Sequence, residues 1–119
     1  MKLIAPFISM HEQLRIFHWQ SKSYAQHKAF GKAYEALGDL IDDFVEVYSG
    51  KYGAPRAKIK YNIVLENFEG EYAEYIDSII SFLVSLTAEL DPNRDTDLMN
   101  IRDEMLAVIN RLKYLLTLS

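Results

Sequence analysis

The stretch GKYGAPRAKIKYNIVLENFEG, residues 50–70, interrupts a chain that is otherwise patterned as helix. The regular spacing of apolar side chains stops there, and glycine, proline and the extended-looking run KIKYNIVL take its place. Roughly 20 extended residues can span about 60 Å, whereas a helix of about 26 residues is about 40 Å long. The stretch can therefore carry the chain back across a whole helical bundle.

Four amphipathic segments surround this connection. Apolar residues recur at steps of three and four over about residues 3–21, 25–50, 70–91 and 95–118. Gly50 and Gly53 are expected to stop the second segment, and Pro92 the third. Two short bends and one long connection predict an all-α, ferritin-like four-helix bundle in a single domain, residues 1–119. An up-down-up-down bundle with a partly helical loop is the alternative.

Composition narrows the possible functions. The chain has 119 residues, no cysteine and a net charge of −4. The lack of cysteine excludes disulfides, thiolate metal sites and cysteine nucleophiles, and the acidic balance argues against nucleic acid as a partner. No apolar run approaches the roughly 18 residues of a membrane span. We therefore expect a cytoplasmic protein that does not enter the membrane.

Two histidines and two carboxylates are the candidate metal ligands. His18 and His27 are equidistant from a bend at about residues 22–23, so an antiparallel hairpin should bring their imidazoles together. Asp42 and Glu46 are one helical turn apart, and their carboxylates can converge on one cation. However, His27 and Asp42 lie about 22 Å apart along one helix. No single ion can touch both within one chain.

A second chain could supply the missing half of this site. If the helix over about residues 25–50 packed antiparallel on its own copy, with a two-fold axis near residues 35 and 36, residue i would face residue 71 − i. The facing pairs would be Lys28 with Asp43 and Lys32 with Asp39. His27 would come opposite residue 44, between the partner's Asp42 and Glu46. The small residues Gly31, Ala36 and Gly38 would let the two helices approach. The alternative interpretation is that these carboxylates form a solvated acidic face.

The pattern His18-Trp19, His27 and Asp42-x-x-x-Glu46 resembles the signature of the Dps mini-ferritins, a branch of the ferritin-like family. In that family such residues build a ferroxidase centre shared between two-fold related subunits. The resemblance therefore implies iron, or another divalent cation such as manganese or zinc, bound by these histidines and carboxylates. It also implies a homo-oligomer of at least two chains, up to a dodecameric cage. The blocks HWQ...H and LID.FVEVY...KYG are similar to those of short phage-encoded proteins as well.

Two functions follow as expectations. The first is a metal-binding protein with an inter-subunit iron site that binds, oxidises or stores iron, and that is ferroxidase-like if the site is intact. Gly31 stands where the Dps family has an aspartate, which removes one carboxylate ligand. The alternative is therefore a non-catalytic, ferritin-like homo-oligomeric structural module of phage origin with a degenerate metal site, working in the host cytoplasm.

Overall fold

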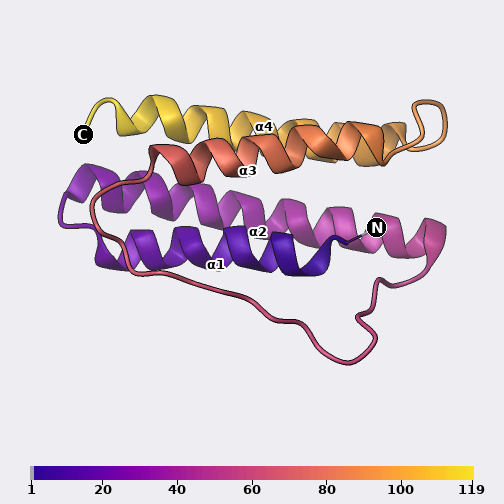
Figure 1. Cartoon of the computed structure of the whole chain (residues 1–119). Coiled ribbons are helices and arrows are strands. Elements are labelled where there is room, and N and C mark those ends of the chain that lie inside the picture. The colour runs from indigo at the N-terminus through magenta and orange to yellow at the C-terminus, as the bar shows by residue number, and fades with distance from the viewer. Residues whose placement is uncertain (1) are drawn as a thin grey trace.

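The computed structural model describes residues 2–119 and contains four α-helices (Figure 1). They are α1 (Ile4–Gln20), α2 (Tyr24–Tyr52), α3 (Ala73–Ser85) and α4 (Thr96–Leu116), and a short 3-10 turn, η1 (Leu86–Ala88), follows α3. No strand occurs in the described part of the chain. The predicted helical bundle is therefore confirmed. Within residues 2–119, no helix is long and apolar enough to cross a membrane.

The helix ends follow from local chemistry. Ser23 caps α2, because its side-chain oxygen accepts a hydrogen bond from the Gln26 amide. The helix runs through Gly50 and stops at Gly53, whose φ of 91° lies in the region that favours glycine. α3 ends at Ser85, earlier than the sequence predicts, and the Leu86 amide bonds to the Leu83 carbonyl where the helix tightens into η1. Arg102 Nη1 donates to the same carbonyl at 2.9 Å.

Residues 53–72 join α2 to α3 without any helix. Figure 1 shows this connection running from the end of α2 back past α1 to the start of α3, near the bend between α1 and α2. Buried Gln13 on α1 holds it in place, donating to the Glu66 carbonyl at 2.7 Å and accepting from the Glu66 amide at 2.8 Å. Gln20 on α1 accepts from the Phe68 amide at 2.6 Å. The last part of the connection is thus fixed to α1.

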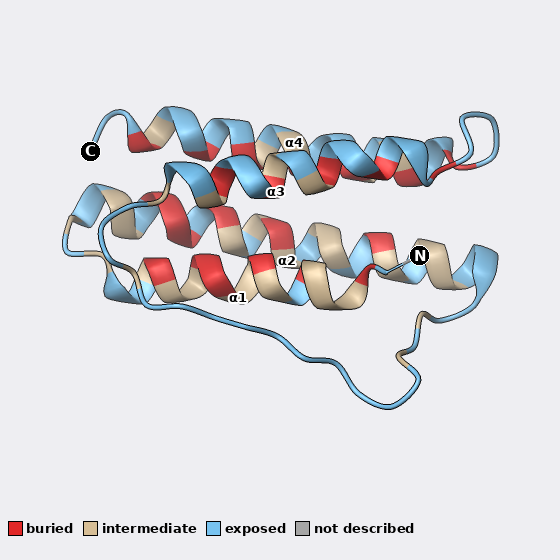
Figure 2. Ribbon diagram, in the orientation of Figure 1, coloured by how far each residue is buried: buried red, intermediate tan, exposed pale blue. Residues whose placement is uncertain are grey.

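The core lies between the helices, where their buried faces meet (Figure 2). Three phenylalanines, Phe7, Phe30 and Phe44, are at most 1% exposed. Phe7 meets Phe44 edge to face with ring centroids 5.3 Å apart, so the large side chains interlock α1 with α2. α2 packs extensively against both α1 and α4, while α3 packs on α4. α2 therefore keeps only one face for solvent or a partner.

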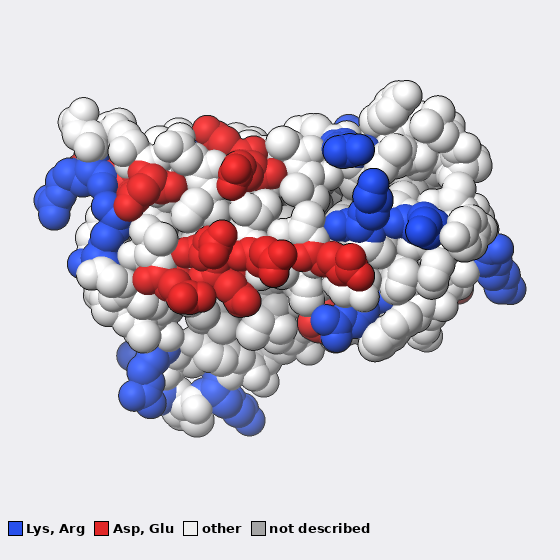
Figure 3. Space-filling view, turned by 180° about the vertical axis from the view of Figure 1, so that it is seen from behind, with Lys and Arg blue, Asp and Glu red and all other residues white. Residues whose placement is uncertain are grey.

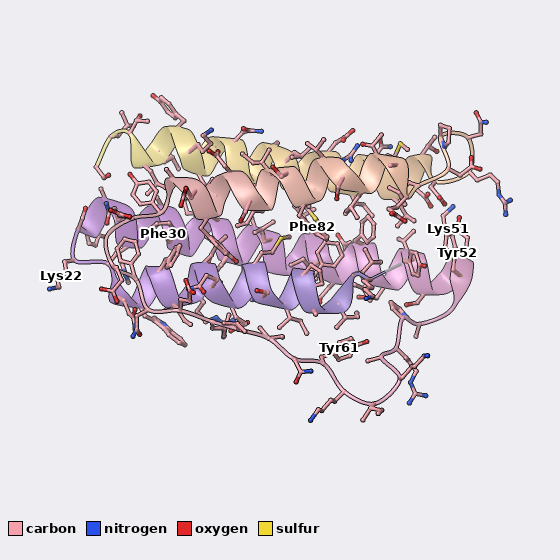
Figure 4. All side chains as sticks on the ribbon, viewed as in Figure 1. Lys22, Phe30, Lys51, Tyr52, Tyr61 and Phe82 are labelled. Carbon is pink, nitrogen blue, oxygen red and sulfur yellow. The ribbon has the colours of Figure 1, made fainter. Side chains whose placement is uncertain are left out.

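A polar latch closes the far end of the bundle, where α2 ends beside the turn that precedes α4 (Figure 4). The Tyr52 hydroxyl donates to Asp95 Oδ1 at 2.5 Å, and Lys51 Nζ donates to the Arg94 carbonyl at 2.6 Å. Asp95 is only 3% exposed and also accepts the Asp91 amide. The bond from Tyr52 holds the pKa of Asp95 below its ordinary value, and that same bond raises the pKa of Tyr52.

Candidate metal centre and self-association face

His18 and His27 meet where α1 turns into α2, as the hairpin argument predicts. Their rings stack with centroids 3.9 Å apart and an interplanar angle of 19°. Each ring bonds to the backbone of the other residue: His18 Nδ1 lies 2.6 Å from the His27 carbonyl oxygen, and His27 Nδ1 lies 2.8 Å from the His18 carbonyl oxygen. Because a carbonyl only accepts, both Nδ1 atoms carry protons. The lone pair of each neutral ring is therefore on Nε2.

Gly31 makes room for this histidine pair. A Cβ placed on Gly31 would lie 2.8 Å from His18 Cε1 and 2.9 Å from His18 Nδ1. The same arrangement recurs one heptad away, where a Cβ on Gly38 would lie 3.0 Å from His11 Nε2. Both glycines thus face α1 of their own chain. The expectation that Gly31 and Gly38 let two copies of the helix approach each other is therefore wrong. Gly31 leaves space for the His18 ring, which explains the glycine without a lost metal ligand.

Tyr34 occupies the space between the two histidine contacts. Its ring centroid lies 5.6 Å from that of His11 and 5.3 Å from that of His18. The guanidinium of Arg15 lies 5.1 Å from the centre of the same ring, within cation–π range. Large side chains on α1 therefore face glycine or tyrosine on α2 in a regular antiparallel register. Sequence reasoning missed this seam, although two histidines and two glycines at matching heptad spacing were the signal for it.

The carboxylates of the expected metal site lie elsewhere. Asp42 and Glu46 are exposed on α2, about 22 Å and about 28 Å of helix from His27. Within residues 2–119, no three histidine or carboxylate side chains are close enough to hold a metal ion together. The four expected ligands therefore do not fit a metal within one chain. A site that used all of them would require a second copy.

The outward face of α2 is divided by charge. Figure 3 shows Asp and Glu in a row along this side of the molecule, with Lys and Arg beyond both ends of the row. We call this surface the α2 face; its exposed charged residues are Lys28, Lys32, Glu35, Asp39, Asp42, Asp43 and Glu46. None of them forms an ion pair within residues 2–119. The charges of this face are therefore balanced by solvent or by another molecule.

Comparison with known proteins identifies the relatives of the chain. Residues 18–116 match the model of a family of unknown function, DUF5856. An uncharacterized 14.6 kDa protein in the mobD-ri intergenic region of Enterobacteria phage T4 is 31% identical over 104 residues, which covers 85% of this chain and 74% of the relative. No solved structure matches the chain. The likeness to a phage protein is thus confirmed.

The resemblance to the Dps mini-ferritins is wrong. The family model that matches is a different one, and it spans all four of the residues that suggested the resemblance. Those four residues form a short pattern, and two of them have a local structural role, since His18 and His27 bind each other's backbone. With a match over most of its length, the chain belongs to the DUF5856 family.

Proposed function

We propose that this protein is a non-catalytic, homo-oligomeric helical module that associates through the α2 face. The observation that carries the proposal is the segregation of unpaired charge on that face. Under a two-fold axis near residues 35 and 36, Lys28 would face Asp43 and Lys32 would face Asp39 of the partner. One such exposed ion pair contributes at most about 1 kcal/mol to association. A two-fold axis repeats each pair, so the interface contains both pairs twice.

The long connection between α2 and α3 supports a finer proposal, that the bundle is of the ferritin-like variety. The phage T4 relative supports a setting inside an infected host cell, in its cytoplasm. The twelve-subunit cage and iron oxidation came from the Dps resemblance and are not part of this proposal.

A charge-swap experiment tests the α2 face. The double variant Lys28→Glu/Lys32→Glu and the double variant Asp39→Lys/Asp43→Lys each place like charges opposite one another across the α2 face. Each should therefore lose this contact and have a lower mass than the wild type by light scattering. An equal mixture should form a heterodimer, because every facing pair then has opposite signs. The quadruple variant should form a homodimer again.

Arg56→Glu/Lys58→Glu is the matched control. It changes the net charge by the same amount as Lys28→Glu/Lys32→Glu, but at exposed residues of the connection between α2 and α3. We expect it to keep the wild-type mass. A wild-type protein that is monomeric at micromolar concentration, or a mixture of the two charge variants without heterodimers, would contradict the proposal.

A second proposal, divalent metal binding across the same interface, rests on the histidine pair. The Nδ1 bonds fix both tautomers and leave Nε2 of His18 and His27 with a free lone pair, as in many metal-bound histidines. In the register above, His27 would lie between the partner's Asp42 and Glu46. Imidazole nitrogen with carboxylate oxygen suits iron, manganese or zinc.

A further inference from the structure

The segment Lys60–Glu66 is an exposed apolar stretch that is anchored to α1 at its last residue, Glu66. It lies outside the bundle, as the position of Tyr61 in Figure 4 shows. Val64 is 80% exposed, and Ile63 and Leu65 are more than one third exposed. Residues 54–70 make no backbone-to-backbone hydrogen bond within the described part of the chain. Apolar side chains beside unpaired backbone are the features of an unprotected edge strand.

The contacts with α1 show which edge of this segment is free. Both backbone groups of Glu66 bond to Gln13, and the Phe68 amide bonds to Gln20. In an extended chain, the backbone groups of alternate residues point to opposite sides. Glu66 and Phe68 therefore face α1, where glutamine side chains satisfy their backbone groups. If the same alternation continues back along the segment, the amides and carbonyls of Tyr61, Ile63 and Leu65 project toward the opposite side.

We propose that this free edge pairs with the same segment of a second copy, as a two-stranded antiparallel ribbon centred on Ile63. In this register residue i faces residue 126 − i, so Ile63 faces itself and Tyr61 faces Leu65 of the partner. The outward backbone groups of the two copies then form up to about six hydrogen bonds. Lys60 faces Glu66 at both ends of the ribbon.

Two features favour a second copy as the occupant of this edge. The charges are self-complementary, because the only cation and the only anion of the segment lie the same distance from its centre. The residues between them are isoleucine, valine, tyrosine and leucine with one asparagine, a composition typical of a paired strand. This surface lies on the α1 side of the bundle and shares no residue with the α2 face. Pairing of this segment and association through the α2 face can therefore be tested independently.

Cysteine cross-linking tests the register, because the chain has no cysteine of its own. Ile63→Cys should form a disulfide-linked dimer under mild oxidation, since facing residues of this type have Cα atoms about 5.5 Å apart. The matched control, Ile59→Cys, replaces a side chain that is 92% exposed, against 36% for Ile63. Both variants are made in the Lys28→Glu/Lys32→Glu background, so that association through the α2 face does not contribute.

The Ile63→Cys variant should cross-link at least about tenfold faster than the Ile59→Cys variant, because two copies of residue 59 would be far apart in the ribbon. Random collision predicts the opposite order, since Ile59 is the more accessible. Equal rates, or faster linking at residue 59, would overturn the proposal.

Proline substitution gives a second test that needs no cross-link. Ile63→Pro removes an amide that the ribbon uses, whereas Asn62→Pro removes one that points toward α1. In the same background, the Ile63→Pro variant should lose the dimer in sedimentation equilibrium and the Asn62→Pro variant should keep it. Circular dichroism should show unchanged helix content in both. If the two proline variants dimerise equally, or if neither dimerises, the pairing does not exist.

Discussion

His18 is held from three directions. Its Nδ1 bonds to the His27 carbonyl, its ring stacks on His27, and its Cε1 edge lies over Gly31. An imidazole with this many contacts cannot swing away without breaking a hydrogen bond. The absence of a side chain at residue 31 is therefore a packing requirement, and it explains why a glycine occurs in the interior of a helix despite a cost of about 1 kcal/mol relative to alanine.

Gly31→Ala should destabilise the protein. The new Cβ would meet His18 atoms closer than 3.0 Å, and overpacking of this kind costs about 1–3 kcal/mol. The gain in helix propensity recovers part of this, so we expect a net loss of about 1 kcal/mol in the free energy of unfolding. Urea denaturation followed by circular dichroism measures it.

Two controls isolate the contact with His18. Gly50→Ala is also within α2, but its Cβ would meet nothing within 4 Å, so it should stabilise the protein by about 0.5–1 kcal/mol. In a His18→Ala background, Gly31→Ala should become stabilising as well, because the obstructing ring is gone. A destabilising effect of the same size in that background would show that His18 is not the cause.

At the scale of elements, the periodicity of apolar residues was sufficient to predict four helices, because a buried face recurs every three to four residues. It failed at the end of α3, where the spacing continues through Leu86 and Leu90 while the backbone tightens into η1 and Arg102 donates to the Leu83 carbonyl. It also gave no reason to expect buried Gln13 to hold the connection. Both contacts join residues far apart in the chain, and periodicity carries no information about them.

The candidate site was predictable only in part, for the same reason. The contact between His18 and His27 was predictable, because the two residues are close in the sequence and flank the same short turn. The role of Gly31 depended on which face of α2 packs against α1. A family pattern that expects aspartate at that position suggested a lost ligand, and the correct explanation required the contact between the helices.

The latch between α2 and α4 should make stability depend on pH. Asp95 has a lowered pKa in the fold, so its contribution is present above the ordinary carboxyl pKa of about 4 and is lost as the pH falls through the folded value. Tyr52 has a raised pKa, so its contribution is present below about pH 10 and is lost as the pH rises through the folded value.

Tyr52→Phe should therefore lower the urea midpoint at neutral pH and flatten the loss of stability at both extremes. Denaturation curves between about pH 2 and pH 11 measure the effect. Tyr114→Phe is the control, because Tyr114 is 61% exposed and lies near the other end of α4. Equal pH profiles for wild type and Tyr52→Phe would show that the hydrogen bond to Asp95 does not couple folding to protonation.

At the scale of the whole molecule, the number of self-complementary surfaces decides the kind of assembly. The α2 face alone would give a closed dimer with two-fold symmetry. If the Lys60–Glu66 segment also pairs, each chain has two such contacts, and copies can join into a closed ring or an open chain. The mass of the wild-type protein, compared with that of variants lacking one surface or the other, distinguishes these assemblies.

The last prediction concerns metal binding across the α2 face. If each centre takes His18 and His27 from one chain and Asp42 and Glu46 from the other, a dimer has two equivalent centres. His27→Ala and Asp42→Ala should each abolish zinc binding measured by calorimetry. In a mixed dimer, one centre contains both substitutions. The other centre takes its histidines from the Asp42→Ala chain and its carboxylates from the His27→Ala chain, so it is intact. Mixing the two variants should therefore restore about half of the wild-type zinc binding in each mixed dimer. If native mass spectrometry shows that the subunits exchange and no zinc binds, the histidines and carboxylates do not meet across the interface.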